Sequence, residues 1–136
     1  MLLIAASLAA TAGGVAACGE EGISNALSPE QHQAAVLFDQ RCSGCHTLTV
    51  AGTQGSATNV RTREYKDGPN FDQRKVTYNC ALYAIRNGGF SSGPMPQDIV
   101  VGAEAEAIAK FLAEESGSEV QLAPGATQPT DCPPPA

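Results

Sequence analysis

The chain has 136 residues, with 14 acidic and 8 basic side chains, a formal net charge of −6 and 43% hydrophobic residues. This length allows one domain of ordinary size. The negative charge argues against a nucleic-acid-binding protein, because affinity for phosphate backbones comes mainly from clustered Lys and Arg. Four Phe, three Tyr and no Trp supply few large core side chains, so we expect a disulfide, a metal or a cofactor to help stabilise the fold.

The N-terminal segment has the composition of an export signal. Residues 1–17 contain no charged side chain, and they are too few for a permanent membrane-spanning helix but enough for a signal peptide. The segment ends in Val15-Ala16-Ala17-Cys18, which resembles the lipobox of bacterial lipoproteins. We therefore expect an exported protein, lipid-anchored through Cys18 on the outer face of the cytoplasmic membrane or in the periplasm. A conventional signal peptide cleaved near Ala17 is the alternative.

Two changes in composition bound the expected domain. Residues 18–27 are polar and acidic and suit a tether. Five of the nine prolines lie in the last sixteen residues, so the tail 117–136 is expected to run extended or to be disordered. The expected folding unit is therefore 28–116, and it contains no internal repeat.

The first of three predicted helices begins after Ser28. Pro29 stands where a helix needs no N–H donor, and Gln31 is placed to close a capping box with Ser28. The helix is expected to extend to about Arg41 and to present an apolar patch that includes Phe38.

Two further helices make the expected domain all-α. The second spans about Asp72–Asn87 and ends at Gly88-Gly89, with one apolar stripe formed by Val76, Cys80, Tyr83 and Ala84. The third spans about Gly102–Glu115, with apolar side chains at helical spacing at Ala105, Ile108, Ala109, Phe111 and Leu112. No run of alternating apolar and polar residues is long enough to predict a strand.

The pentapeptide Cys42-Ser43-Gly44-Cys45-His46 carries the strongest chemical signal. C-x-x-C-H is the pattern of covalent haem attachment. Two thiols three residues apart on one helical turn can each add to a vinyl group at the porphyrin edge, and the adjoining histidine then reaches the iron. The motif predicts one haem c, held by Cys42 and Cys45, with His46 as an axial ligand.

Two other uses of these cysteines stay open. A redox dithiol also uses C-x-x-C, but it usually follows a strand in a βαβ unit, and no such pattern precedes Cys42. A structural zinc site could recruit Cys42, Cys45, Cys80 and Cys132. That site would leave His46 without a role.

The order of motifs resembles that of the class I monohaem c-type cytochromes, over about Ser28–Ser116. After the C-x-x-C-H motif come Gly68-Pro69-Asn70-Phe71, Ile85-Arg86-Asn87-Gly88, Gly93-Pro94-Met95-Pro96 and Phe111-Leu112. The resemblance implies a cytochrome c-like fold, with three main helices around one covalently bound haem and with Phe38 and Phe111 where the first and last helices cross. It also implies that the carbonyl of Pro69 accepts a hydrogen bond from the imidazole of His46.

Met95 is the predicted second axial ligand of the iron. The sequence has two methionines, and Met1 would leave with the signal peptide. Pro94 and Pro96 restrict the loop around Met95, and thioether ligation raises the reduction potential. A methionine that only fills a gap beside the haem is the alternative, and His32 is expected to be a solvated side chain.

Six-coordinate iron leaves no position for a substrate, so the resemblance implies electron transfer between redox partner proteins, with no enzymatic activity, small-molecule substrate or nucleic-acid partner. Two alternatives stay open. One is a subunit fixed in an oxidase or dehydrogenase complex. The other is a haem protein that binds ligands or peroxide because Met95 is labile.

Cys80 and Cys132 remain once Cys18, Cys42 and Cys45 are assigned. An exported protein favours pairing them, and the bond would fasten the proline-rich tail across the second helix. The alternative is a buried Cys80 that packs as a small apolar residue, with Cys132 free or paired between chains.

Charge is unevenly distributed along the chain. Residues 61–86 hold six basic and three acidic side chains, whereas residues 98–131 hold one basic and seven acidic ones. Part of the basic stretch is a candidate for contact with the haem edge or its propionates. A solvated face is the other interpretation.

Overall fold

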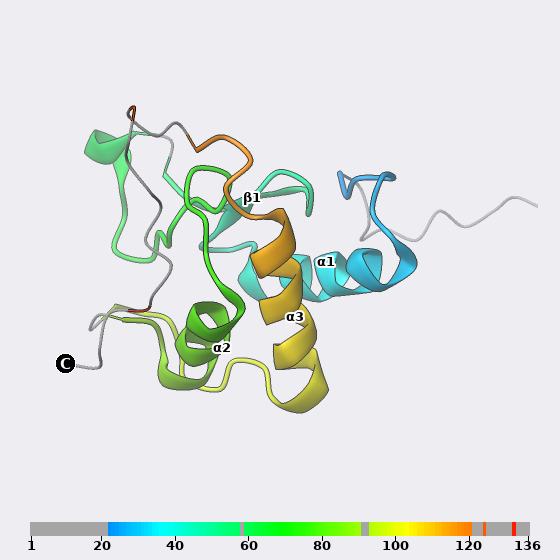
Figure 1. The fold of residues 1–136 in the computed structure, drawn as a ribbon. Coiled ribbons are helices and arrows are strands. Elements are labelled where there is room, and N and C mark those ends of the chain that lie inside the picture. The colour runs from blue at the N-terminus through cyan, green and yellow to red at the C-terminus, as the bar shows by residue number, and fades with distance from the viewer. Residues whose placement is uncertain (1–21, 58, 91–92, 121–123, 125–131, 133–136) are drawn as a thin grey trace, which may run out of the picture.

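The computed structural model describes residues 22–57, 59–90, 93–120, 124 and 132. Its elements are, in chain order, α1 (Pro29–Cys42), β1 (Thr47–Leu48), β2 (Thr53–Gln54), the 3-10 helix η1 (Val60–Thr62), α2 (Tyr78–Asn87) and α3 (Gly102–Glu115). In Figure 1, α3 crosses α1, and it packs against both α1 and α2. The three predicted helices are present and the domain is mainly helical. Within the described residues, no helix is long and apolar enough to cross a membrane.

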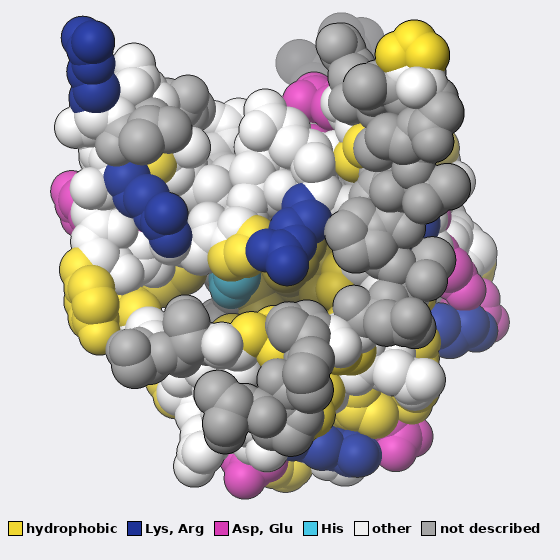
Figure 2. Space-filling view, turned by 60° about the vertical axis from the view of Figure 1, so that its left-hand side comes forward, with side chains coloured by type: hydrophobic (Ala, Val, Ile, Leu, Met, Phe, Trp, Pro, Cys, Tyr) yellow, Lys and Arg dark blue, Asp and Glu magenta, His cyan; other side chains and the backbone are white. Residues whose placement is uncertain are grey.

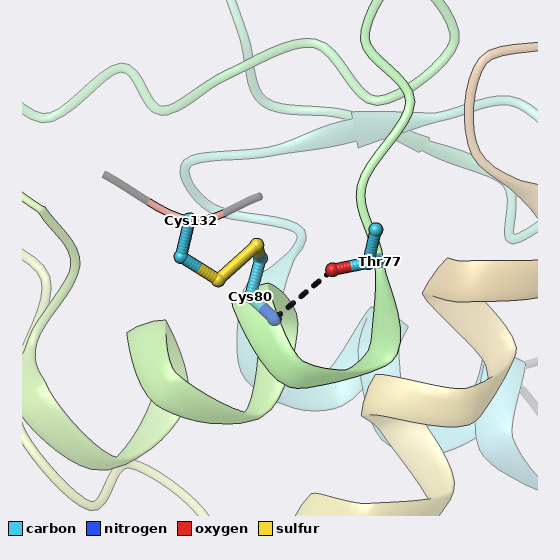
Figure 3. The surroundings of a disulfide bond; sticks show 3 residues. All are labelled: Thr77, Cys80 and Cys132. Atoms are coloured by element: carbon cyan, nitrogen blue, oxygen red, sulfur yellow. Dashed lines mark hydrogen bonds between the residues drawn. A yellow bond between two sulfur atoms is a disulfide. The ribbon is translucent and has the colours of Figure 1, made fainter. Parts of the chain in front are cut away.

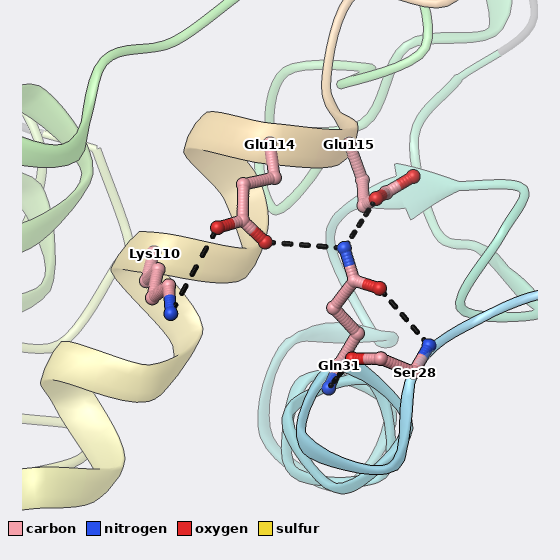
Figure 4. Close-up of polar contacts among 5 residues, drawn as sticks. All are labelled: Ser28, Gln31, Lys110, Glu114 and Glu115. Atoms are coloured by element: carbon pink, nitrogen blue, oxygen red, sulfur yellow. Dashed lines mark hydrogen bonds and ion pairs between the residues drawn. The ribbon is translucent and has the colours of Figure 1, made fainter.

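The start of α1 has the predicted capping box. The hydroxyl of Ser28 accepts a hydrogen bond from the backbone N–H of Gln31 at 3.2 Å, and the side-chain oxygen of Gln31 accepts one from the N–H of Ser28 at 3.0 Å. The amide nitrogen of Gln31 then donates to the carboxylates of Glu114 and Glu115, at 3.1 and 2.8 Å (Figure 4). The residue that caps α1 therefore also ties its start to the end of α3.

The hydrophobic core joins α1 to α3. Phe38 and Phe111 are each 1% exposed and belong to one buried cluster. The helix α3 has the predicted bounds, and the apolar side chains expected to face the core are buried, namely Ala105, Ile108, Ala109, Phe111 and Leu112. Burial of a side chain such as Phe stabilises a fold by about 1.5–3 kcal/mol.

The helix α2 is shorter than predicted at its N-terminal end. Thr77 caps it, because its hydroxyl accepts a hydrogen bond from the backbone N–H of Cys80 at 3.3 Å. The carboxylate of the buried Asp72 accepts hydrogen bonds from the N–H and the hydroxyl of Thr49, at 2.9 and 2.8 Å. These tertiary contacts hold residues 72–77 outside the helix, although their periodicity is helical.

The apolar stripe predicted for α2 is wrong in part. Val76 precedes the helix, and its N–H donates to the hydroxyl of Ser116 at 3.0 Å. Tyr83 is partly exposed and stacks on Phe90, with ring centroids 5.2 Å apart. The buried side chains of α2 are those of Cys80, Ala81 and Ile85. The helix ends as predicted, at Gly88 in the left-handed conformation with φ 76°.

A short antiparallel hairpin, not predicted from the sequence, follows the C-x-x-C-H motif. Thr47 lies opposite Gln54, and Leu48 lies opposite Thr53. Leu48 and Thr53 are both buried. Strands of two residues are too short to show the alternation by which a strand is recognised in a sequence.

Residues on both sides of the expected 28–116 unit contact it. Ile23, inside the predicted tether, is buried and forms a β-bridge with Ala51. Beyond the unit, the N–H of Gly117 donates to the carbonyl of Phe71 at 2.7 Å. The predicted signal 1–17 and the predicted lipidation site Cys18 lie outside the described residues.

A disulfide joins Cys80 to Cys132, the pairing predicted from the count of cysteines (Figure 3). It links α2 to the C-terminal tail over a sequence separation of 52 residues. Because both thiols are used in this bond, the alternative zinc site loses half of its ligands. Among the described residues, no group of three or more His, Cys, Asp or Glu side chains is placed to hold a metal ion.

Removal of the disulfide should weaken the fold. Replacement of both Cys80 and Cys132 by Ala should lower the free energy of unfolding by about 4 kcal/mol, the loop-closure value for a separation of 52 residues. Chemical denaturation of the holoprotein measures this change. Reductant should bring the wild type to the stability of the double variant and leave the variant unchanged. Equal stability of the variant and the oxidised wild type would contradict the prediction.

Candidate haem site

A cavity of about 1260 Å³ opens beside α1 and α2. Most small-molecule pockets have volumes of roughly 300–1,000 Å³, so this cavity suits a large ligand. Its walls include every side chain predicted to hold a haem, namely Cys42, Cys45, His46 and Met95. Figure 2 shows the hollow, with hydrophobic side chains along it and a histidine visible inside.

The two cysteines of the C-x-x-C-H motif are free thiols on one tight turn. Cys42 is the last residue of α1, and its carbonyl accepts hydrogen bonds from the N–H groups of Cys45 and His46 at 3.1 and 2.9 Å. Burial, with a smaller effect of Cys45, raises the pKa of the Cys42 thiol to about 12. A redox dithiol needs a thiolate of low pKa, and the described residues contain no βαβ unit. The site therefore does not support the dithiol alternative.

His46 is buried and held in one tautomer. Its Nδ1 lies 3.1 Å from the carbonyl oxygen of Pro69. Because a carbonyl only accepts, Nδ1 carries the proton and Nε2 keeps a lone pair for a metal ion. Burial lowers the pKa of His46, and the hydrogen bond to Pro69 opposes this effect in part. The ring is therefore neutral at neutral pH, which is the form that binds iron.

Two chain segments run side by side around His46. The N–H of Gly68 donates to the carbonyl of Cys45 at 2.7 Å, and the N–H of Phe71 donates to the carbonyl of Thr47 at 2.8 Å. The ring of Phe71 stacks on the imidazole, with centroids 4.9 Å apart and planes 16° apart. Sequence reasoning assigned no role to Phe71, although it belongs to the motif that contains Pro69.

Two glycines lie so close to the C-x-x-C-H turn that a larger residue would not fit at either position. A Cβ at Gly68 would overlap the ring of His46 and lie 2.6 Å from Nδ1. A Cβ at Gly55 would lie 2.7 and 2.8 Å from the backbone nitrogens of Cys45 and His46. Neither glycine has a positive φ. Gly68 was recognised only as part of the Gly68-Pro69-Asn70-Phe71 motif, without a steric role, and nothing in the sequence pattern distinguished Gly55 from a glycine of a flexible loop.

The Met95 loop is fixed to the end of α2. The N–H of Asp98 donates to the carbonyl of Ile85 at 3.0 Å. A Cβ at Gly88 would lie 2.8 Å from the carbonyl oxygen of Met95, so the loop packs directly on the last turn of the helix. The half-buried side chain of Met95 is thereby held at the cavity wall.

Residues 32–116 match the family model for cytochrome c, and the chain therefore belongs to the cytochrome c family. Its fold is also similar to that in the crystal structure of the c-type cytochrome SorU from Sinorhizobium meliloti. The two chains are 27% identical, the match covers 68% of this chain and 97% of SorU, and the TM-score is 0.50. No curated protein matches the chain.

The family assignment confirms the predicted class, the class I c-type cytochromes, and with it the predicted fold and cofactor. The cofactor is one covalently attached haem c. The side chains at the cavity fit this group, because two unpaired thiols, a neutral imidazole and a thioether all line one large space. Electron transfer to redox partner proteins is the general function of such domains, which are generally exported to the periplasm.

A methyl group at Gly68 should disturb the site. The Gly68→Ala variant must displace the ring of His46, and overpacking of this kind typically costs about 1–3 kcal/mol. We expect lower stability and a lower haem content per polypeptide, measured by thermal unfolding and by absorbance. Gly68→Val should be more severe than Gly68→Ala. Wild-type haem content and stability in the Val variant would contradict the packing described.

Proposed function

We propose that this chain is a monohaem electron carrier in which Cys42 and Cys45 would form the thioether bonds while His46 and Met95 would bind the iron. The observation that supports this assignment is the convergence of all four side chains on one cavity of about 1260 Å³. Bound haem c supplies an iron that gains and loses one electron. The roles of the protein are to hold the group, to orient the ligands and to exclude water.

The thiols hold the cofactor. Cys42 and Cys45 are free thiols, and each would hold the haem by addition across a vinyl group, an addition that needs no oxidant. Attachment at Cys42 and Cys45 would fix the group next to the end of α1.

His46 and Met95 differ in how firmly they are positioned. The imidazole is fixed by Pro69 and by stacking on Phe71, and the hydrogen bond at Nδ1 makes Nε2 a better electron donor. The thioether of Met95 is a weak ligand held by its loop on the end of α2. Thioether ligation favours reduced iron, so this pair of ligands raises the reduction potential.

The cavity lining favours an electron carrier over an enzyme. Its lining includes the apolar side chains of Phe38, Phe71, Ile99, Ile108 and Leu112. His46 is the one histidine at the cavity, and His32 on α1 does not line it. Within the described residues, the lining therefore provides no second imidazole to assist in breaking a peroxide bond.

The ligand assignment is tested by substitution of Met95. Met95→Ala should lower the reduction potential, remove the iron–sulfur charge-transfer absorbance and allow external imidazole or carbon monoxide to bind. Visible spectra of the wild type and the variant in both redox states measure these changes. Met95→Leu is the matched control, because it keeps the volume and removes the sulfur. An unchanged spectrum in Met95→Leu would show that Met95 only fills space.

Tethering to a membrane completes the proposed function. The uncharged segment 1–17 and the small residues before Cys18 support cleavage at that cysteine and its acylation. Two or three acyl chains give stable attachment, because each buried CH₂ contributes roughly 0.8 kcal/mol. The carrier would then act at the outer face of the cytoplasmic membrane or in the periplasm, next to membrane-bound electron donors and acceptors.

Cys18→Ser should release the protein from the membrane. We expect the wild type in the membrane fraction and the variant in the soluble fraction, both with the same haem content and spectrum. Fractionation of cells followed by haem staining measures the distribution. Retention of the variant together with other subunits of a complex would favour the fixed-subunit alternative. An equal soluble share of both proteins would contradict the lipid anchor.

A further inference from the structure

The chain that leads into α1 is docked on the turn of the β1–β2 hairpin. Ile23 is buried and forms an antiparallel β-bridge with Ala51, which is buried as well. Next to this bridge, the N–H of Ser24 donates to the carbonyl of Val50 at 2.9 Å. Residues 22–24, the docked segment, are therefore a fixed part of the domain.

Backbone packs directly on backbone at the docked segment. A Cβ at Gly52 would lie 2.8 Å from the carbonyl carbon of Gly22, so no side chain fits between the two chains. The side chain of Ile23 is 7% exposed and belongs to the same hydrophobic cluster as the buried side chains of the helices. Undocking would expose this apolar side chain to water, which is unfavourable.

The docked segment shortens the tether between the proposed lipid anchor and the domain. The composition of the sequence predicted a tether of residues 18–27, which would span at most roughly 35 Å when fully extended. From Cys18 to Ile23 the chain advances by only five residues, which span at most roughly 18 Å. A domain of about 100 residues has a radius of gyration of about 13 Å, which corresponds to a sphere with a radius of roughly 17 Å.

These lengths decide how far an anchored domain can turn. A tether as long as the domain is wide allows every face to approach the lipid. A tether no longer than the radius keeps its point of attachment on the half of the domain that faces the membrane. The docked segment and the hairpin turn on which it packs would therefore lie toward the lipid.

The two stretches of chain that meet at the docked segment are uncharged. Residues 22–29 and 47–59 contain no Asp, Glu, Lys or Arg, and charged residues begin again at Glu21 and Glu30. The chain as a whole has a net charge of −6. Anionic headgroups repel carboxylates that come within about a Debye length, about 10 Å at 0.1 M salt. A face without carboxylates is therefore the one with which an acidic domain approaches a lipid surface most easily.

The mouth of the haem cavity lies on another side of the molecule. Neither residues 22–28 nor residues 48–53 line the large cavity. In Figure 1 the residues that precede α1, drawn in blue, lie at the right of the molecule. The hollow comes into view in Figure 2, after the left-hand side has been turned forward. A domain held by its docked segment would thus direct the mouth of the cavity away from the lipid.

We propose that the anchored protein rests on the lipid surface through one face, formed by residues 22–28 and the hairpin turn 48–53, with the mouth of the haem cavity directed toward the water. This orientation rests on the proposed acylation of Cys18. Lipid headgroups are the partner of this face, and redox proteins reach the cofactor from the aqueous side. The tether thus restricts how the cofactor is approached as well as where the carrier is located.

The experiment measures the linear dichroism of the haem Soret band for acylated holoprotein in oriented bilayers of phosphatidylcholine. The porphyrin absorbs light polarised in its plane, so a fixed orientation of the domain gives dichroism and free rotation abolishes it. Polarised infrared absorbance of the helices in the amide I band supplies a second direction on the same film, in case the haem plane lies at the angle of zero dichroism. The wild type should show dichroism in at least one of the two bands.

Two variants should lose the orientation while they keep the visible spectrum of the wild type. Insertion of about twelve Gly and Ser residues after Glu21 extends the reach of the tether to roughly 60 Å and leaves the docked segment unchanged. It should lower the dichroism several-fold. Ile23→Asp places a charge at a buried position, which favours undocking, and it should also lower the dichroism.

Asn25→Asp is the matched control, because it adds the same charge two residues further along the chain, where the side chain is exposed. It should retain the dichroism of the wild type. Wild-type dichroism in Ile23→Asp as well would show that the docked segment does not set the orientation.

Two outcomes distinguish a failure of this proposal from a failure of the proposed function. An acylated wild type whose dichroism equals that of the insertion variant in both bands overturns the orientation and leaves the anchored electron carrier intact. A wild type whose mass shows no acyl chains contradicts the lipid anchor, and the orientation with it.

Discussion

The hydrogen bond between Nδ1 of His46 and the carbonyl of Pro69 is the contact on which the rest of the site depends. At 3.1 Å it fixes the tautomer that leaves Nε2 free for iron. The backbone hydrogen bonds from Gly68 to Cys45 and from Phe71 to Thr47 hold the intervening Pro69 beside His46. The buried Asp72 extends this arrangement by accepting hydrogen bonds from Thr49. These hydrogen bonds thus form the side of the haem site that holds His46.

The chain has few aromatic residues, and the structure has a large cavity that its side chains do not fill. Phe38, Phe71 and the ring of His46 form one group of neighbouring rings, and beside them lies a cavity rather than further side chains. Haem c, as the cofactor of the family, contributes the large apolar body that a chain of this composition lacks. Both the stability and the function of the protein therefore depend on the cavity. The residues that line it contribute to both.

The C-terminal tail and the charged side chains also have defined positions relative to the cavity. The bond from Cys80 to Cys132 attaches the C-terminal tail to α2, which itself carries the Met95 loop. Negative charge is concentrated in α3 and the tail, whereas the cations that border the cavity come mainly from residues 63–75.

Local signals in the sequence determined the start of α1, the bounds of α3, the C-x-x-C-H turn and the end of α2 at Gly88, because capping, helical spacing and motif chemistry act within a few residues. The pairing of Cys80 with Cys132 could be predicted by counting. The tertiary structure alone decided where α2 begins, since the contact of Asp72 with Thr49 joins residues far apart in the chain. It also decided that Gly55 and Gly68 must be glycine and that Phe71 stacks on His46, because each depends on which backbone or ring comes close after folding.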